Sequence, residues 1–229
     1  MKKLVVLTGA GMSAESGIKT FRDNNGLWEN YGVMEVASID GWKKNPQLVL
    51  DFYNQRRKQL YEVEPNAGHY ALAELERDFD VKIITQNVDD LHERAGSSTV
   101  VHLHGELKKV RSSVNPSHVF ELDGWELKWG DKCPYGSQLR PHIVWFGEEV
   151  PMMDVAASIT EEADLLAVIG TSLQVYPAAG LVHYAPSHIP KYLIDPKGEP
   201  VRGLQNLTVL NKTATQGVAE LKDILSQLV

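Results

Sequence analysis

The stretch that decides the fold lies at residues 4–17 and reads LVVLTGAGMSAESG. Its first four residues are apolar on both faces, which predicts a buried strand of a parallel sheet. Gly9 and Gly11 follow, where glycine allows a tight turn and a close approach of the backbone to a ligand. The spacing Gly9-x-Gly11-x-x-Ala14 fits the looser dinucleotide-binding pattern, in which phosphate meets a helix start. A plain tight turn is the alternative interpretation.

The bulk composition bounds the class of protein. The chain has 229 residues, 43% of them apolar, which suits one sizeable domain or one domain with a smaller inserted module. Its net charge of -7 argues against nonspecific DNA binding, although basic peptides remain possible partners. The single cysteine, Cys133, excludes an intrachain disulfide and indicates a reducing compartment. Because no leader-like segment or long apolar run occurs, we expect a cytoplasmic protein without membrane contact.

Short apolar runs alternate with helical patterns along most of the chain, which predicts an α/β fold with a parallel sheet. Two segments break this alternation, a stretch at 26–61 with two predicted helices and a polar stretch at 107–139. Together they could form a smaller module, with a ligand cleft at the carboxyl ends of the strands. The other predicted strands are 81–85, 100–103, 165–170 and 191–194, and the other predicted helices are 66–79, 155–162 and 216–228.

Two strand ends carry groups suited to catalysis. In TQNVDDLH at 85–92, Gln86 and Asn87 can bind an amide or a ribose, and Asp89 can accept from a carboxamide. An ordinary loop that caps the next helix is the alternative. In VHLHG at 101–105, His102 and His104 share a face of the strand, and an imidazole can act as a general base near neutral pH. A structural histidine is the alternative there.

Two further stretches follow predicted strands. In RPHIVWFGE at 140–148, the residues Phe146-Gly147-Glu148 could offer backbone groups to an extended peptide. The alternative is a strand whose aromatic side chains fill the core. The small and hydroxyl residues at 170–178 suit phosphate or ribose contacts, or else cap a helix.

Taken together and in this order, the motifs resemble those of the sirtuin family over nearly the whole chain. The matching segments are GAGMSAESGI at 9–18, FR at 21–22, GLW at 26–28, TQNVD at 85–89, HG at 104–105, VWFGE at 144–148 and GTS at 170–172. Sirtuins are NAD-dependent lysine deacylases. The resemblance implies a Rossmann-like parallel sheet with helices on both faces, formed by 1–25, 63–106 and 138–229. It also implies a smaller module with a helical part at 26–62 and a degenerate zinc-binding part at 107–137.

The resemblance also implies the reaction. NAD is consumed as a co-substrate, and the products are nicotinamide, free lysine and O-acyl-ADP-ribose. His104 matches the catalytic base, with Asn87 and Asp89 beside it. Asp195, where many relatives carry asparagine, can accept from ribose hydroxyls and favours NAD over NADP. The NAD-binding residues implied by the match are Gly9, Ala10, Gly11, Ser13, Ala14, Glu15, Phe21, Arg22, Trp28, Gln86, Asn87, Val88, Asp89, Gly170, Thr171, Ser172, Asp195, Pro196, Lys197 and Ala214.

Tyr53 and Arg56 indicate which acyl group the protein removes. The two residues share a face of a predicted helix. On the residues alone, a solvated basic face that includes Arg57 and Lys58 is the commoner interpretation. The motif Tyr-x-x-Arg is similar to that of the bacterial-type sirtuins that remove succinyl and malonyl groups. An arginine fork and a tyrosine hydroxyl suit a carboxylate. The implied substrate-binding residues are Ala37, Tyr53, Arg56, Val144, Phe146, Gly147 and Glu148.

The chain departs from the family pattern where relatives carry two Cys-x-x-Cys pairs. The matching positions are Ser112 with Asn115 and Cys133 with Gly136, so one thiolate of four remains. A structural zinc site needs about four nitrogen or sulfur ligands, and we therefore predict no zinc. A rescued site would combine Cys133 with His118, Asp123 or Asp131. Without metal, the aromatic and apolar residues expected to hold this module by packing are Trp125, Leu127, Trp129, Pro134 and Tyr135.

Three other functions compete with deacylation. A redox enzyme needs an acidic residue at the end of the second strand, but Trp28-Glu29-Asn30 follows no predicted strand. A protein ADP-ribosyltransferase would use the same cleavage of NAD. A noncatalytic module would bind NAD or an acyl-peptide without turnover. We expect a monomer that acts on acyl-lysine proteins or peptides and does not bind nucleic acid.

Overall fold

The computed structural model describes residues 1–19, 27–28 and 31–228. Its larger lobe is built on a parallel six-stranded sheet in the order β11-β10-β9-β1-β4-β5. The five strands predicted for this sheet are confirmed to within one residue. β11 was not predicted, because its four residues alternate in burial at the sheet edge and give a weak signal. The strands are β1 Lys3–Thr8, β4 Asp80–Thr85, β5 Val100–His102, β9 Leu165–Ile169, β10 Lys191–Ile194 and β11 Leu207–Leu210.

The winding of this sheet places the ligand-binding edge. From β1 the chain moves to β4 and β5 on one side, and later to β9, β10 and β11 on the other. The strand order therefore reverses at β1, whose residues pair with both β4 and β9. In doubly wound sheets, ligands bind outside the carboxyl ends of the strands at this reversal. The loops after β1, β4 and β9 meet there.

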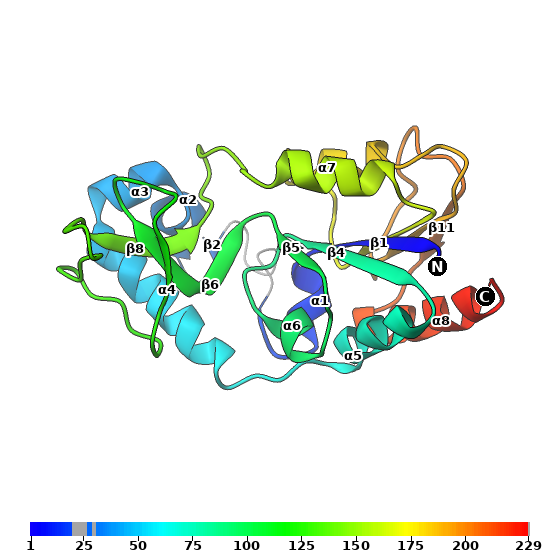
Figure 1. The fold of residues 1–229 in the computed structure, drawn as a ribbon, viewed down its shortest axis with the longest axis horizontal. Coiled ribbons are helices and arrows are strands. Elements are labelled where there is room, and N and C mark those ends of the chain that lie inside the picture. Colours follow the sequence, from blue (N-terminus) through cyan, green and yellow to red (C-terminus); the bar gives the residue numbers. More distant parts are fainter. Residues whose placement is uncertain (20–26, 29–30, 229) are drawn as a thin grey trace.

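Helices cover both faces of the sheet, as predicted (Figure 1). α7 packs on one face through Ala156, while α5 and α8 pack on the other, α8 through Val218, Leu221 and Leu225. Those three residues recur at helical spacing, so α8 turns a continuous apolar stripe toward the strands. The helices of this lobe are α1 Ala10–Ala14, α5 Ala67–Glu74, α6 Leu91–Arg94, α7 Met153–Glu161 and α8 Ala214–Ser226, with 3₁₀ turns at Leu75–Arg77 and Ala178–His183.

The smaller lobe combines helices from one segment with an antiparallel sheet from another. Where two helices and no strand were predicted, the structure has three helices and a short hairpin. Ser38 and Asn45 each accept a backbone N–H at a helix start, which divides the segment. The sheet order is β7-β6-β8. The elements are β2 Leu27–Trp28, β3 Tyr31–Gly32, α2 Val33–Val36, α3 Ile39–Lys44, α4 Pro46–Leu60, β6 Gly105–Ser112, β7 Val119–Glu121 and β8 Leu139–Ile143.

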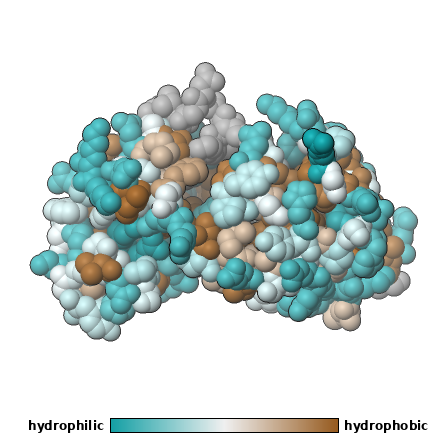
Figure 2. All heavy atoms as spheres, turned by 90° about the horizontal axis from the view of Figure 1, so that it is seen from above, coloured by the Kyte–Doolittle hydropathy of each residue, from teal (hydrophilic) through white to brown (hydrophobic). Residues whose placement is uncertain are grey.

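These elements enclose a core of their own that includes Trp42, Phe52 and Trp145. Seen from above, the two lobes are divided by a notch (Figure 2). Within the described ranges, no helix is long and apolar enough to cross a membrane.

Two expectations about the smaller lobe were wrong. Of the five residues expected to hold the polar module by packing, Leu127 is buried, but Pro134 and the three aromatic residues are exposed. The alternative interpretation of α4 as a solvated basic face is also wrong for Arg57, which is fully buried. Arg57 donates from Nε to the Leu107 carbonyl, at 2.6 Å, and from Nη1 to the Trp125 carbonyl, at 2.6 Å. Polar side chains therefore connect the module to α4, and its aromatic residues are left at the surface.

Candidate active site

A cavity of about 500 Å³ lies at the reversal of the sheet and is lined by residues of both lobes. It brings together residues from nine separate parts of the chain. Phe21 and Arg22 lie outside the described residues, as does the side chain of Trp28. The predicted site residues that line the cavity are Gly9, Ala10, Gly11, Ser13, Ala14, Glu15, Ala37, Tyr53, Arg56, Gln86, Asn87, Val88, Asp89, His104, Val144, Phe146, Gly147, Glu148, Gly170, Thr171, Ser172, Asp195, Pro196, Lys197 and Ala214.

The floor of the cavity is formed where two glycine loops touch. The Gly11 N–H donates to the Gly170 carbonyl at 2.8 Å, and a Cβ on Gly11 would lie 2.7 Å from the Gly170 Cα. Gly170 itself has φ of +64°, which favours glycine. The sequence pattern was attributed to close approach of a ligand, but in the structure these glycines are required by the contact between the loops after β1 and β9. α1, which follows, is only five residues long.

A buried polar network lies beside this floor. Ser13 donates through Oγ to Asp89 Oδ2 at 2.9 Å and accepts from Asn87 Nδ2 at 3.0 Å. Asp89 Oδ1 accepts the Leu91 N–H at 3.2 Å. Burial raises the pKa of Asp89, and the bonds from Ser13 and Leu91 oppose part of that effect. The network fixes the orientation of the Asn87 amide, because Nδ2 of that amide donates to the Ser13 hydroxyl.

His104 presents an imidazole at the same cavity. Its Nδ1 lies 3.1 Å from the Gln86 carbonyl, which selects the tautomer with hydrogen on Nδ1. Nε2 then carries a lone pair and makes no hydrogen bond to the part of the chain that the structure describes, so it can accept a proton. Burial lowers the pKa of His104, and the Gln86 carbonyl opposes this only in part. A neutral imidazole at neutral pH is the form that a general base requires.

Tyr53 and Arg56, from one face of α4, line the opposite wall. The Trp145 indole donates from Nε1 to the Tyr53 hydroxyl at 3.0 Å. Tyr53 is therefore an acceptor in that bond, and its own proton remains available to donate. Burial raises the pKa of Tyr53, with the Trp145 bond opposing it, so the phenol stays protonated. This wall presents a hydroxyl and a guanidinium to the cavity.

The segment after β8 is held by a buried ion cluster. The Glu148 carboxylate accepts from Arg140 at 2.7 Å and from Arg111 at 3.0 Å. Burial opposes its ionisation, but these bonds and charges bring the pKa of Glu148 below its usual range. Phe146 donates its N–H to the Ala37 carbonyl at 2.9 Å, so this segment bridges the two lobes. Backbone at such a bridge can bind an extended chain.

The far end of the cavity combines loops after β1 and β10 with the start of α8. Asp195 Oδ1 accepts the Lys197 N–H at 2.9 Å, which holds that loop in a tight turn. Glu15 accepts from both the N–H and the hydroxyl of Thr215, at 2.9 and 2.7 Å. Glu15 therefore fastens the loop after β1 to α8 and is already engaged.

Several lining residues were missed by sequence reasoning. Trp145 was noted only as part of an aromatic run, and nothing local reveals its bond to Tyr53, 92 positions earlier. Apolar side chains around the ends of β8 and β9 carry no motif of their own. The remaining unpredicted lining residues are Ile18, Lys19, Ile143, Trp145, Val150, Val175, Tyr176, Pro177, Ile194 and Thr213.

The positions that match zinc ligands also come together, but as a hydrogen-bonded cluster. Ser112 and Ser137 lie 2.7 Å apart through their hydroxyls, and Cys133 Sγ lies 3.0 Å from the Ser137 hydroxyl. The Ser112 hydroxyl also accepts the Asn115 N–H at 3.0 Å. Ser137 takes part instead of the expected Gly136. Over the described ranges no group of three His, Cys, Asp or Glu residues could hold a metal, and this donor set does not fit zinc.

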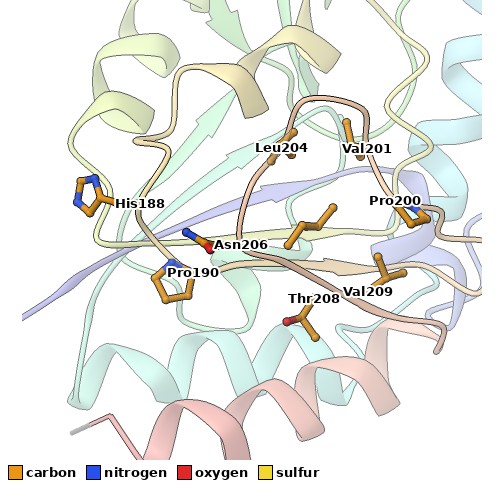
Figure 3. Close-up of a pocket in the computed structure, with 9 residues that line it drawn as sticks. His188, Pro190, Pro200, Val201, Leu204, Asn206, Thr208 and Val209 are labelled. Atoms are coloured by element: carbon orange, nitrogen blue, oxygen red, sulfur yellow. The ribbon is translucent and has the colours of Figure 1, made fainter.

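A second hollow, of about 650 Å³, lies beside the edge strand β11 (Figure 3). It is enclosed by the loop that carries Val201 and Leu204, and His188 is the titratable side chain among its lining residues. A lone histidine without an acid or a nucleophile beside it makes no catalytic set. The first cavity is therefore the candidate site.

Comparison with known proteins gives a consistent result. Residues 9–177 match the model of the Sir2 family. An NAD-dependent protein deacylase of Bacteroides thetaiotaomicron is 59% identical over 230 residues, covering 98% of each chain. A solved complex of a Sir2 homologue with NAD is 41% identical, with a TM-score of 0.86, over 99% of this chain and 90% of that one. A mutant Sir2 homologue with 2'-O-acetyl ADP-ribose is 40% identical, with a TM-score of 0.87, over 99% and 93%.

Proposed function

The chain belongs to the Sir2 family and is an NAD-dependent protein deacylase, and we propose that it prefers succinyl- and malonyl-lysine while also accepting acetyl-lysine. The observation that carries this proposal is that Tyr53 and Arg56 line the same cavity as His104 and Asn87. An acyl chain that reaches past the reacting carbon would meet a guanidinium and a phenol. Both groups donate to a carboxylate.

The acyl wall is suited to an acidic group for two physical reasons. Arg56 is 7% exposed, and a cation removed from water is stabilised by an anion that enters beside it. Tyr53 already accepts from Trp145, so its proton can be donated to the same carboxylate. Ala37 also lines the cavity, and its small side chain leaves room for a longer acyl chain. An acetyl group fits this space but uses neither donor.

The proposed reaction uses NAD as a substrate. The acyl-lysine oxygen attacks the ribose carbon as the bond to nicotinamide breaks, through a transition state with oxocarbenium character. His104, neutral and oriented by the Gln86 carbonyl, takes a proton from a ribose hydroxyl through Nε2. That hydroxyl then attacks the acyl-derived intermediate, and water completes the release of free lysine and O-acyl-ADP-ribose. The similar Sir2 homologue solved with 2'-O-acetyl ADP-ribose is consistent with this product.

The other site residues take supporting roles in the proposal. Asn87, Asp89 and Ser13 would contact nicotinamide and its ribose, and Gly170 with its neighbours would hold phosphate. Asp195 would accept from the adenosine ribose and repel a phosphate there, which favours NAD over NADP. We further propose that the small module needs no zinc, supported by the hydroxyl and thiol cluster at the matching positions.

The test is a panel of acetyl-, malonyl-, succinyl- and glutaryl-lysine peptides with NAD, with nicotinamide release and peptide mass as readouts. In the Arg56→Met variant, succinyl turnover should fall roughly 10- to 100-fold more than acetyl turnover, because a charge-assisted bond is lost. Lys58→Met is the matched control, since it removes an exposed cation from the same helix.

Equal loss on both substrates in Arg56→Met would contradict the acyl preference. Nicotinamide release with ADP-ribose added to the peptide would instead identify a transferase. Binding of NAD and peptide without any release would identify a noncatalytic module.

A further inference from the structure

Two histidines at the end of β5 contact consecutive carbonyls of the loop after β4. His104 Nδ1 lies 3.1 Å from the Gln86 carbonyl, and His102 Nδ1 lies 3.1 Å from the Asn87 carbonyl. Their second nitrogens differ, because His102 Nε2 lies 2.7 Å from a Glu93 carboxylate oxygen. Both nitrogens of His102 therefore face acceptors. Only the imidazolium form can donate to both at once.

We propose that His102, as a cation, is a positioning residue that holds the Asn87 carbonyl and so sets the orientation of the Asn87 amide for NAD. His102 has no role in the proposed chemistry and is absent from the lining of the cavity. It acts through the backbone of the loop that carries Asn87 and Asp89.

The loop has few other anchors at this point. The Asn87 N–H donates to the Thr85 hydroxyl at 3.0 Å, and the next carbonyl, of Val88, accepts the Leu107 N–H at 2.8 Å. Between these two bonds, the Asn87 carbonyl is held by His102 Nδ1. Loss of that bond leaves a peptide unit beside the site free to rotate, and the Asn87 side chain rotates with it. The bond from Asn87 Nδ2 to Ser13 then loses its geometry.

The surroundings of His102 favour its charged form. Burial would lower the pKa of His102, but the hydrogen bond and charge of Glu93, the Asn87 carbonyl and the charge of Glu106 raise it above the ordinary 6.5. His102 and its partner Glu93, on α6, interact electrostatically with other titratable groups. These are His92 on α6, Asp89 before that helix, and Glu106 and Lys109 on β6.

The direction of the pH effect depends on which of its two hydrogen bonds the His102 ring keeps when it becomes neutral. A raised pKa means that the cation persists to a higher pH than in an ordinary histidine and is lost as the pH rises through that pKa. The neutral ring has one N–H, which stays with the Glu93 carboxylate because that is the stronger acceptor. The Asn87 carbonyl then faces a lone pair. His104 acts in the opposite sense, since its pKa is lowered and it becomes a base as the pH rises.

The test is the pH profile of kcat/KM for NAD, measured on the full chain with an acetyl-lysine peptide so that acyl preference plays no part. We expect kcat/KM of the wild type to rise with pH as His104 loses its proton. It should fall at higher pH as His102 loses its proton. Glu93→Gln should move the alkaline fall to lower pH, because it removes the charge that stabilises the imidazolium. His102→Gln should abolish this fall and lower kcat/KM for NAD roughly 2- to 10-fold, with little change in KM for the peptide.

Glu74→Gln is the matched control, because Glu74 pairs with Lys222 on the outer surface. It should leave the profile unchanged. An NMR titration of the His102 ring, assigned by the change of its midpoint in Glu93→Gln, gives a readout that needs no activity and also serves if His102→Gln folds poorly. A titration midpoint at or below 6.5, a profile without the alkaline fall, or a fall that Glu93→Gln leaves in place would each overturn the proposal.

Discussion

The ligand-binding edge of the large sheet and the small antiparallel module are stabilised in opposite ways. At the sheet edge, glycine loops touch over strands that are buried on both faces, and polar groups such as Ser13 and Asp89 are added at the strand ends. In the small module, buried polar groups such as Arg57 make the connection, while Trp129 and Tyr135 lie exposed. Replacing a polar residue at the sheet edge should therefore lower turnover. Replacing a polar residue that connects the small module should lower the free energy of unfolding.

The largest expected effect is at the sheet edge. His104→Ala should lower deacylation roughly 100-fold or more, the range for loss of a general base, while the melting temperature stays close to that of wild type. The measurement is nicotinamide release together with thermal unfolding. Near-normal deacylation by this variant would remove His104 from the mechanism, and a collapse of the fold would remove the contrast between the two regions.

The corresponding experiment for the small module is Arg57→Met, because Arg57 connects that module to α4. Arg57 donates to two backbone carbonyls and to Asn54 Oδ1. A methionine of similar length removes this donor from both buried carbonyls, while Asn54 Oδ1 keeps the bond from the Leu127 N–H. We expect a loss of about 2 to 4 kcal/mol in the free energy of unfolding, measured by urea denaturation. Lys58→Met, which replaces an exposed neighbour, should change stability by less than about 0.5 kcal/mol. Similar values for both variants would show that the buried guanidinium is not the connection between the module and α4.

A smaller effect is expected where the two regions meet. Trp145→Phe keeps the ring but removes the indole N–H that donates to Tyr53. The ratio of succinyl to acetyl kcat/KM should fall roughly 3- to 10-fold, since the hydroxyl is no longer oriented by that bond. Trp42→Phe is the control, because its ring centroid lies 5.5 Å from that of Trp145 and it loses the same volume. An equal change of the ratio in both variants would assign the effect to packing.

The smallest expected effect is that of metal removal. Because Ser112 and Cys133, two of the four positions that match zinc ligands, form a hydroxyl and thiol cluster with Ser137, a chelator should leave the unfolding midpoint unchanged. Elemental analysis of the purified protein should find no stoichiometric zinc. One tightly held zinc per chain would mean that metal, and not buried polar groups, stabilises the module.

Much of the large lobe could be predicted because its signals are local. The strand at 191–194 was predicted to the residue, and the other four to within one residue, since each is a short and largely apolar run. β11 and the short hairpin β2–β3 could not be predicted from the sequence, because two to four residues at a sheet edge are too few to show a periodic pattern. The division of the helical segment depended on caps at Ser38 and Asn45, which are only visible once the helix boundaries are known.

The sequence by itself determined the α/β class of the sheet and most of the residues at its carboxyl edge, because short motifs and apolar runs act through neighbours in the chain. Only the tertiary structure decided which of two adjacent arginines, Arg56 or Arg57, lines the cavity and which lies in the core. It alone also decided that His102 faces a carbonyl and a carboxylate together. These outcomes depend on partners up to 68 positions away, and no local pattern encodes which distant group will be buried against a given side chain.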